Sequence, residues 1–387
     1  MKRKCWLFST LMVCSGLAFA QPFKDSLDAR MQQLGKQLLN EKGGIGLSAG
    51  IYHNGQVYYY NFGATQAGTT KTPSSQTMYE IGSVTKTFES YILANAVIEG
   101  RVKPGDDIRK YLKGSYPGLE YNGKGIQLIH LATTTSLLPD WLPELPAGIK
   151  ALPPAEASKA RADFYRHLSK QDLLNALQHV KLDTLPGSKR SHSNAGAQLL
   201  AYILEDVYQM PMDKLIKKYI TKPAKMERTF FIDSSRLKYM ATGYTGTGEK
   251  SGYEFNVPYF KYAGGLGSCT EDLVKYIQLL LKKTNPASVL SLKKAVDINA
   301  STGEITPLTA EGIATPEVYS AALNWFKYQP EVNVAQIWAD GGTNGFNSYL
   351  VMYPYLNSGI VLLANKSDEK IFRALPGIAY ELSKLLK

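Results

Sequence analysis

A serine and a lysine stand three residues apart in the stretch Tyr79-Glu80-Ile81-Gly82-Ser83-Val84-Thr85-Lys86-Thr87-Phe88. On a helix, residues at this spacing share one face. A serine hydroxyl is a poor nucleophile unless a neighbouring base removes its proton, and a lysine whose burial disfavours the charged form can be that base. We therefore expect Ser83 and Lys86 to act as a nucleophile and its base.

The residues after Ser83 predict a helix from Val84 to Glu99. Apolar residues recur there at intervals of three and four, and Gly100 suits a left-handed cap. Ser83 would then lie in the first turn, where the helix dipole favours developing negative charge. The Ser-x-x-Lys pattern is weak by itself, since it recurs at Ser235/Lys238, Ser291/Lys294 and Ser367/Lys370.

The first twenty residues have the composition of an export signal. Lys2-Arg3-Lys4 form a charged start, Trp6 to Leu17 are mostly apolar, and Ala18-Phe19-Ala20 suits cleavage after Ala20. The apolar run is too short for a membrane span, and Val13 before Cys14 disfavours a lipid anchor. We expect an exported protein, periplasmic or secreted, without a transmembrane anchor.

Composition narrows the remaining classes of function. The 387-residue chain carries a net charge of +11, which suits an anionic partner such as a membrane surface or cell-wall polymer. No nucleic-acid module, phosphate loop or dinucleotide fingerprint is present, and the five histidines lack metal-ligand spacing, so we expect no cofactor, no metal and no nucleic-acid partner. Cys269 is the cysteine left after signal removal, which excludes an internal disulfide. We expect it to be a packed or capping residue.

The predicted elements run from a helix and a hairpin, through a long helical part, to strands and a closing helix. The early elements are a helix over Phe23–Leu38 and strands Gly46–Tyr52 and Gln56–Phe62, joined by an Asn54-Gly55 turn. Helices are expected at Val84–Glu99, Ala155–Leu168, Lys170–Val180, Asn194–Tyr208, Met212–Ile220 and Thr270–Lys283. Strands follow at Tyr319–Tyr328, Asn333–Trp338, Asn347–Tyr353 and Gly359–Ala364, before a helix from Lys370.

This order predicts an α/β (α+β) fold with a helical insertion. Residues 21–82 and 255–387 would form an antiparallel sheet flanked by helices, and residues 83–254 a mainly helical domain, with Ser83 where the two meet. The proline-rich loop Pro139–Pro154, with Trp141, would form a rim of the cleft. Gly46-Leu47-Ser48-Ala49-Gly50 matches a nucleophile elbow, but it runs on into a hairpin strand rather than a helix, so we interpret Ser48 as structural.

The chain resembles the serine β-lactamase and penicillin-binding-protein family, in its class C-like branch of β-lactamases, D,D-peptidases, D-aminopeptidases and β-lactamase-like esterases. The resemblance covers nearly all of the mature chain and implies the β-lactamase/transpeptidase-like fold. The motifs that carry it, in chain order, are Ile81–Phe88, Leu128–Pro139, Leu185-Pro186-Gly187, Ser193–Gly196, Ala263–Leu266 with Thr270–Leu273, and Gly341–Phe346.

The resemblance implies an active site of three motifs. The first is Ser83 with Lys86. The second, usually Tyr-x-Asn, falls on His192-Ser193-Asn194, where Asn194 would bind substrate and Lys86, and His192 would relay protons in place of the tyrosine. The third, usually Lys- or His-Thr/Ser-Gly, falls on Ala339-Asp340-Gly341, which would line the substrate. The backbone N–H groups of Ser83 and Gly342 would form the oxyanion hole.

These departures bear on the substrate. Ala339 lacks the third-motif charge and Asp340 adds a negative one, so we expect substrates with a carboxylate to be poor, and neutral esters or amides, or substrates with an amine facing Asp340, to be better. The predicted function is an exported serine hydrolase that forms a Ser83 acyl-enzyme with an ester or amide, such as a cell-wall-derived peptide or another small molecule. The alternatives are a true β-lactamase or D,D-carboxypeptidase and, in another class, a catalytically inactive cell-wall or protein binding module. The oligomeric state stays open.

Overall fold

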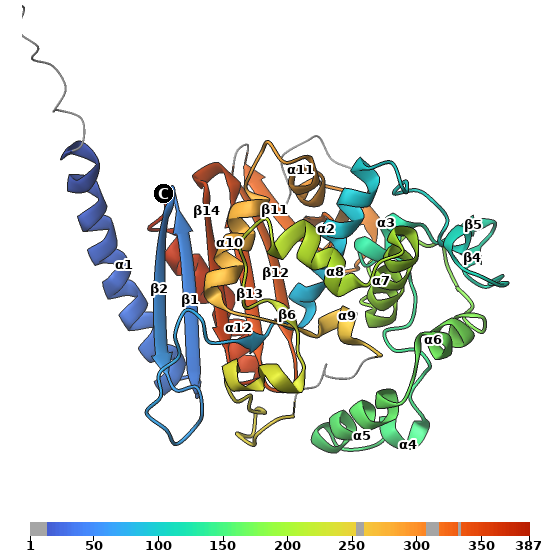
Figure 1. Ribbon diagram of the computed structural model, residues 1–387, viewed down its shortest axis with the longest axis horizontal. Coiled ribbons are helices and arrows are strands. Elements are labelled where there is room, and N and C mark those ends of the chain that lie inside the picture. Colours follow the sequence, from blue (N-terminus) through green and yellow to red (C-terminus); the bar gives the residue numbers. More distant parts are fainter. Residues whose placement is uncertain (1–13, 253–258, 307–316, 332–333) are drawn as a thin grey trace, which may run out of the picture.

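Nine antiparallel strands form one sheet, in the order β2-β1-β14-β13-β12-β11-β10-β8-β9. The computed structural model describes residues 14–252, 259–306, 317–331 and 334–387 (Figure 1). The strands of this sheet are β1 Gly46–His53, β2 Gln56–Gly63, β8 Val296–Asn299, β9 Ile305–Thr306, β10 Val318–Ala321, β11 Phe326–Glu331, β12 Val334–Gly342, β13 Asn347–Tyr353 and β14 Ser358–Ala364. Strands from both ends of the chain thus share one sheet, as predicted.

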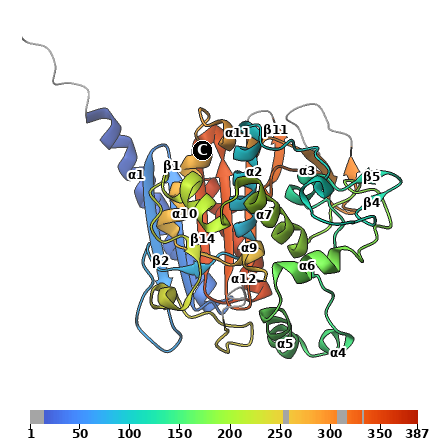
Figure 2. The ribbon, with the colours of Figure 1, turned by 45° about the vertical axis from the view of Figure 1, so that its right-hand side comes forward.

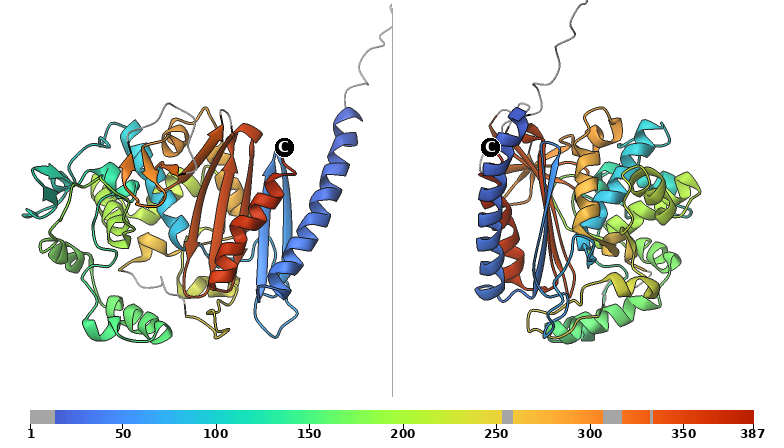
Figure 3. Two further views of the ribbon diagram at one scale, coloured as in Figure 1. Left: turned by 180° about the vertical axis from the view of Figure 1, so that it is seen from behind. Right: turned by 60° about the vertical axis from the view of Figure 1, so that its left-hand side comes forward.

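Helices cover both faces of this sheet (Figure 3). The α-helices are α1 Cys14–Asn40, α2 Thr85–Ile98, α3 Leu128–Ala132, α4 Ala147–Lys150, α5 Pro154–Arg166, α6 Lys170–Leu177, α7 Asn194–Tyr208, α8 Met212–Ile216, α9 Lys261–Gly264, α10 Thr270–Leu280, α11 Pro286–Leu292 and α12 Glu369–Ser383. Shorter pieces are β3 Tyr79–Glu80, β4 Glu120–Tyr121, β5 Lys124–Gly125, β6 Phe230–Phe231, β7 Leu266–Ser268 and the turns η1 Gly82–Val84, η2 Ile108–Tyr111, η3 Lys217–Thr221, η4 Ser234–Tyr239 and η5 Pro354–Leu356.

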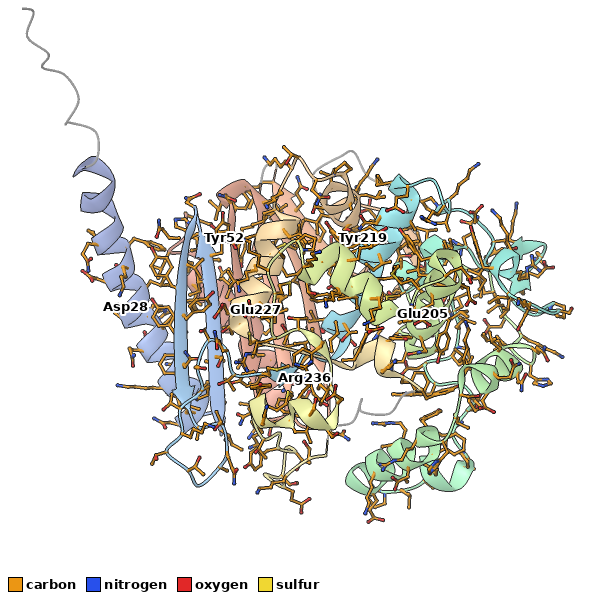
Figure 4. The ribbon with its side chains drawn as sticks, in the orientation of Figure 1. Asp28, Tyr52, Glu205, Tyr219, Glu227 and Arg236 are labelled. Atoms are coloured by element: carbon orange, nitrogen blue, oxygen red, sulfur yellow. The ribbon has the colours of Figure 1, made fainter. Side chains whose placement is uncertain are left out.

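The helices from the two ends of the chain, α1 and α12, pack on one face of the sheet. Apolar residues at helical spacing in both helices form one buried cluster with that face, including Leu27 and Met31 of α1 and Leu375 and Leu382 of α12. Asp28, labelled in Figure 4, accepts a hydrogen bond of 2.6 Å from the Tyr60 hydroxyl of β2. This contact joins α1 to the outermost strand on that side of the sheet.

The other face carries α10 and the helical part of the chain. Helix α10 approaches the sheet closely because β1 and β14 have glycines beneath it: a Cβ at Gly50 would lie 2.8 Å from Val274, and one at Gly359 would lie 2.6 Å from Ile277. Helices α2 and α7 lie beside one another in the helical part, while α4 and α5 lie at its edge (Figure 2). This arrangement brings the start of α2 against the end of β12.

Several predicted elements have the expected bounds and turns. Helix α7 and strand β13 match their predicted residues, the hairpin turn has positive φ at Asn54 and Gly55, and Gly100 follows α2 with φ of +70°. None of the helices in the described part of the chain is both long and apolar enough to cross a membrane. Most of the predicted signal and Asn333 lie outside the described residues, as does the predicted domain boundary at residue 255; α1 begins at Cys14 and runs past Ala20.

Three predictions of local structure were wrong. The segment Tyr319–Tyr328 is two strands, β10 and β11, because the chain reverses at Ala322–Trp325, where Asn324 has φ of +55°. Helix α8 ends at Ile216, since the backbone widens into one π-type turn over Lys217–Thr221. Ser83 lies in the 3₁₀ turn η1 that leads into α2, and not within the α-helix; Gly82, the first residue of this turn, has φ of +51°.

Candidate active site

Ser83 lies where η1 meets the end of β12. The contact is close because both segments have glycines: a Cβ on Gly82 would lie 2.7 Å from the backbone nitrogen of Gly342. A Cβ on Gly341 would lie 2.1 Å from the carbonyl oxygen of Ile81 and 2.8 Å from the backbone nitrogen of Ser83. Backbone of the predicted first and third motifs is therefore in direct contact.

Lys86 is the buried base candidate next to Ser83. Its side chain is in the first turn of α2, the residue is 4% exposed, and Nζ lies 3.0 Å from Ser83 Oγ. Nζ also donates to Asn194 Oδ1 at 2.9 Å and to the Ala263 carbonyl at 2.7 Å. Burial lowers the pKa of Lys86 to about 8, and nearby carboxyl groups, Glu89 first, act in the opposite direction. A neutral amine beside the hydroxyl is thus accessible near neutral pH.

Asn194 and His192 are joined by a residue that the sequence analysis did not single out. Asp140 Oδ1 lies 2.8 Å from His192 Nδ1 and accepts the backbone N–H of Asn194 at 2.9 Å. Burial alone would raise the pKa of Asp140, but the hydrogen bonds from His192 and the Asn194 backbone bring it below its ordinary value. The His192 side chain is 47% exposed, and with Nδ1 held by Asp140, its Nε2 is the nitrogen left to exchange a proton.

The start of α7 is fixed by its cap. Ser193 is the N-cap residue, and its hydroxyl accepts the Gly196 N–H at 2.8 Å and donates to the Pro139 carbonyl. A serine before an apolar helix is a typical N-cap, which is why the sequence predicted this helix start. The cap and Asp140 together hold Asn194 at a fixed distance from Lys86.

Strand β12 brings the third motif to the same place. Strand β11 begins at Phe326, opposite Trp338, so among the described residues β12 from Ala339 to Gly342 has no paired strand on that side. Ala339 is buried and lines a cavity next to Ser83 and Lys86. An unpaired strand edge beside a nucleophile can bind an extended substrate.

Asp340, the next residue of β12, borders two separate hollows. Asp340 pairs with Tyr349 of β13, and its Cβ points to the same side of the sheet as that of Trp338, toward α12. One of the two hollows is the cavity that contains Ser83, and the other lies beside Phe372. Burial raises the pKa of Asp340, while the positive charge of Arg190 is the strongest influence in the opposite direction.

The cavity also has walls that the motifs did not reveal. Thr134, Arg190, Trp325 and Phe326 line it together with Ser83 and His192. Arg190 lies two residues before His192 of the second motif. This closeness in sequence was the one indication that Arg190 belongs to the site. In the described ranges, no cluster of three or more His, Cys, Asp or Glu side chains could hold a metal ion.

Three other residues singled out from the sequence lie outside this cavity. Ser48 is fully buried in β1 and bonded to Asn61 and to the Tyr79 hydroxyl, in agreement with a structural role. Cys269 is buried at the N-cap position of α10, and burial raises its pKa to about 12. Trp141, expected on the cleft rim, packs against Phe260 and Tyr165 instead, as part of a cluster of aromatic rings.

Comparison with known proteins gives one consistent result. A model of the Beta-lactamase family matches residues 27–380. A β-lactamase of Yersinia enterocolitica is 26% identical over 379 residues, which cover 90% of this chain and 89% of the relative. The D-alanyl-D-alanine-carboxypeptidase/endopeptidase AmpH of Escherichia coli K12 is 26% identical over 385 residues, which cover 96% of this chain and 94% of the relative.

Solved structures share the fold. A β-lactamase/D-alanine carboxypeptidase from Yersinia pestis has a TM-score of 0.74 at 24% identity, over 93% of this chain and 99% of that chain. A class C β-lactamase has a TM-score of 0.73 at 20% identity, over 95% of this chain and 97% of that chain. The β-lactamase/transpeptidase-like fold inferred from the sequence is confirmed. Since the family model extends from α1 to α12, the chain belongs to the Beta-lactamase family, whose members are serine hydrolases.

Proposed function

We propose that this protein is an exported hydrolase that cleaves an ester or amide through an acyl-enzyme on Ser83. The observation that carries the proposal is the buried Lys86 amine, 3.0 Å from Ser83 Oγ, with a pKa lowered to about 8. A base of this strength can take the hydroxyl proton as the oxygen attacks a carbonyl.

The reaction would proceed in two steps. Ser83 Oγ bonds to the substrate carbonyl carbon and its proton passes to Lys86; the negative oxygen of the tetrahedral intermediate accepts hydrogen bonds from the backbone N–H groups of Ser83 and Gly342. The proton then reaches the leaving alkoxide or amine through Lys86 and His192, and the acyl group stays on Ser83. In the second step water adds to the acyl carbon and gives up a proton along the same route; the bond between the acyl carbon and Ser83 Oγ breaks, Oγ takes the proton, and the acid is released.

Asn194 and Asp140 would support these steps in different ways. Asn194 holds Nζ of Lys86 and has an amide N–H₂ to offer to the substrate. Asp140 fixes one ring nitrogen of His192, so the other can relay protons. Ala339, Asp340 and Gly341 would lie along the substrate as the unpaired edge of β12.

Export and the division of the chain belong to the same proposal. The N-terminal composition supports cleavage after Ala20, and mass spectrometry of protein from a periplasmic or culture fraction should give a first residue of Gln21. We also propose that residues 21–82 with 255–387, and residues 83–254, are the two domains that meet at Ser83.

A fluorophosphonate probe tests the proposed nucleophile. We expect covalent labelling of the intact protein, with the label mapped to the peptide that contains Ser83 and lost in Ser83→Ala. Ser235→Ala is the matched control, because Ser235 belongs to another Ser-x-x-Lys pattern on the exposed turn η4 and should label like the wild type. A wild-type protein that stays unlabelled would favour the inactive binding module, and a label that survives Ser83→Ala would show that Ser83 is not the nucleophile.

A further inference from the structure

Arg190 is a cation on the wall of the active-site cavity. It lies in the loop before α7 and lines the cavity together with Ser83 and Lys86. Its backbone is held from both sides: the Arg190 N–H donates to the Gly303 carbonyl at 2.6 Å, and the Ser191 N–H donates to the Thr134 carbonyl at 2.7 Å. The side chain therefore extends from a fixed point beside the nucleophile.

The guanidinium group is positioned by an aromatic ring, and it lies near enough to Asp340 to act on the pKa of that carboxyl group. Its Cζ lies 4.6 Å from the centre of the Phe326 ring, which is also part of the cavity wall. Among the described residues no carboxylate lies within ion-pair distance of it. A guanidinium stacked on a ring keeps the N–H groups at its edge available, and these match a carboxylate in a two-bond arrangement.

Arg190 is better suited to bind a carboxylate than the other charged groups around the cavity. Lys86 must be neutral to accept the serine proton, and its pKa is lowered to about 8. Asp140 is bonded to His192, and Asp340 has its pKa raised by burial, with Arg190 acting in the opposite direction. Arginine keeps its charge at every pH that the protein would meet.

The position of Arg190 on the cavity wall indicates which class of substrate the enzyme cleaves. We infer that Arg190 binds a carboxylate of the substrate, so that the cleaved ester or amide carries an anionic group close to the scissile carbonyl. The inference rests on the acyl-enzyme proposed for Ser83. It is opposite to the sequence-based expectation of poor carboxylate substrates, which considered Ala339 and Asp340 alone, and the experiment below decides between the two. The cation comes from the loop before the second motif rather than from β12.

A pair of chromogenic esters tests the inference. The monoester of glutaric acid with p-nitrophenol carries a free carboxylate, and its methyl ester, methyl p-nitrophenyl glutarate, is the neutral match. We expect the wild type to favour the anionic ester in kcat/KM, and Arg190→Gln to lower the ratio of anionic to neutral turnover by about tenfold to a hundredfold. Arg190→Lys should restore part of that ratio. Lys189→Gln removes an exposed neighbouring charge and should leave the ratio unchanged.

Two results would overturn the inference. One is a wild type that favours the neutral ester; the other is an Arg190→Gln protein, folded by circular dichroism, that loses both activities in proportion. If the wild type hydrolyses neither ester, the proposed catalysis is at fault, and binding decides about Arg190. Calorimetry with glutarate should then show binding to Ser83→Ala and at least about tenfold weaker binding to Ser83→Ala/Arg190→Gln. Equal affinity in the two proteins would refute the carboxylate site.

Discussion

The pH dependence of acylation follows from the environment of Lys86. Only the neutral amine can accept the Ser83 proton, and burial lowers the Lys86 pKa to about 8. The neutral fraction is then about 1% at pH 6, about 10% at pH 7 and about 90% at pH 9. For a neutral ester we therefore expect kcat/KM to rise about ninetyfold over this range, with its midpoint at about pH 8.

The assay is the hydrolysis of p-nitrophenyl butyrate under kcat/KM conditions, corrected for the background hydrolysis at each pH. His192→Phe separates the two bases: the plateau should fall, but the midpoint should stay, because Lys86 still takes the first proton. The assignment of the base to Lys86 would be refuted by a midpoint about 1.5 pH units lower, where imidazoles ordinarily titrate, if that midpoint disappears in His192→Phe. A flat profile would refute it as well.

Three further predictions concern residues around this pair. Asp140→Asn should lower kcat by about tenfold to a hundredfold, because His192 loses its orienting charge; Asp206→Asn, on the exposed end of α7, is the control, and an equal loss in both would contradict this role. Gly341→Ala should lower kcat by about a hundredfold or more, because its Cβ meets the Ile81 carbonyl at 2.1 Å and displaces the Ser83 N–H; unchanged kcat would show that the contact is not required. Glu89→Met should stabilise the fold by about 1–3 kcal/mol at pH 8, because both Glu89 oxygens are buried without a hydrogen-bond partner among the described residues. Burial raises the Glu89 pKa well above 4.5, so its folded form holds its proton longer than the unfolded chain and wild-type stability falls as pH rises above that value. Chemical denaturation of both proteins from pH 4 to pH 8 should show a gap that widens with pH; a constant gap would contradict the explanation.

The sequence predicted the parts of the site whose signals are local. The helix start at Asn194 follows from its serine cap, and the Ser83–Lys86 pair follows from a three-residue spacing. Strand β13 follows from the apolar run Tyr349–Tyr353, and all of its residues are buried. In each case the deciding interactions lie within one turn or one strand.

The parts that the sequence did not reveal depend on contacts between distant segments. Asp140 is 52 positions from His192, and nothing near either residue indicates their hydrogen bond. The turn between β10 and β11 contains neither glycine nor proline, so the apolar residues on both sides of it predicted one continuous strand. Asn324 was the one residue in the sequence that indicated a turn. Arg190 reaches the cavity because a distant backbone carbonyl, that of Gly303, holds its loop in place.

The most direct test of the account is the mass of the protein during turnover of p-nitrophenyl butyrate. Rapid acid quenching followed by intact-protein mass spectrometry should show one added butyryl group on the wild type and none on Ser83→Ala, with nitrophenol release that depends on Ser83. Equal nitrophenol release by the two proteins, with no added mass on either, would contradict the central claim that Ser83 carries the acyl group.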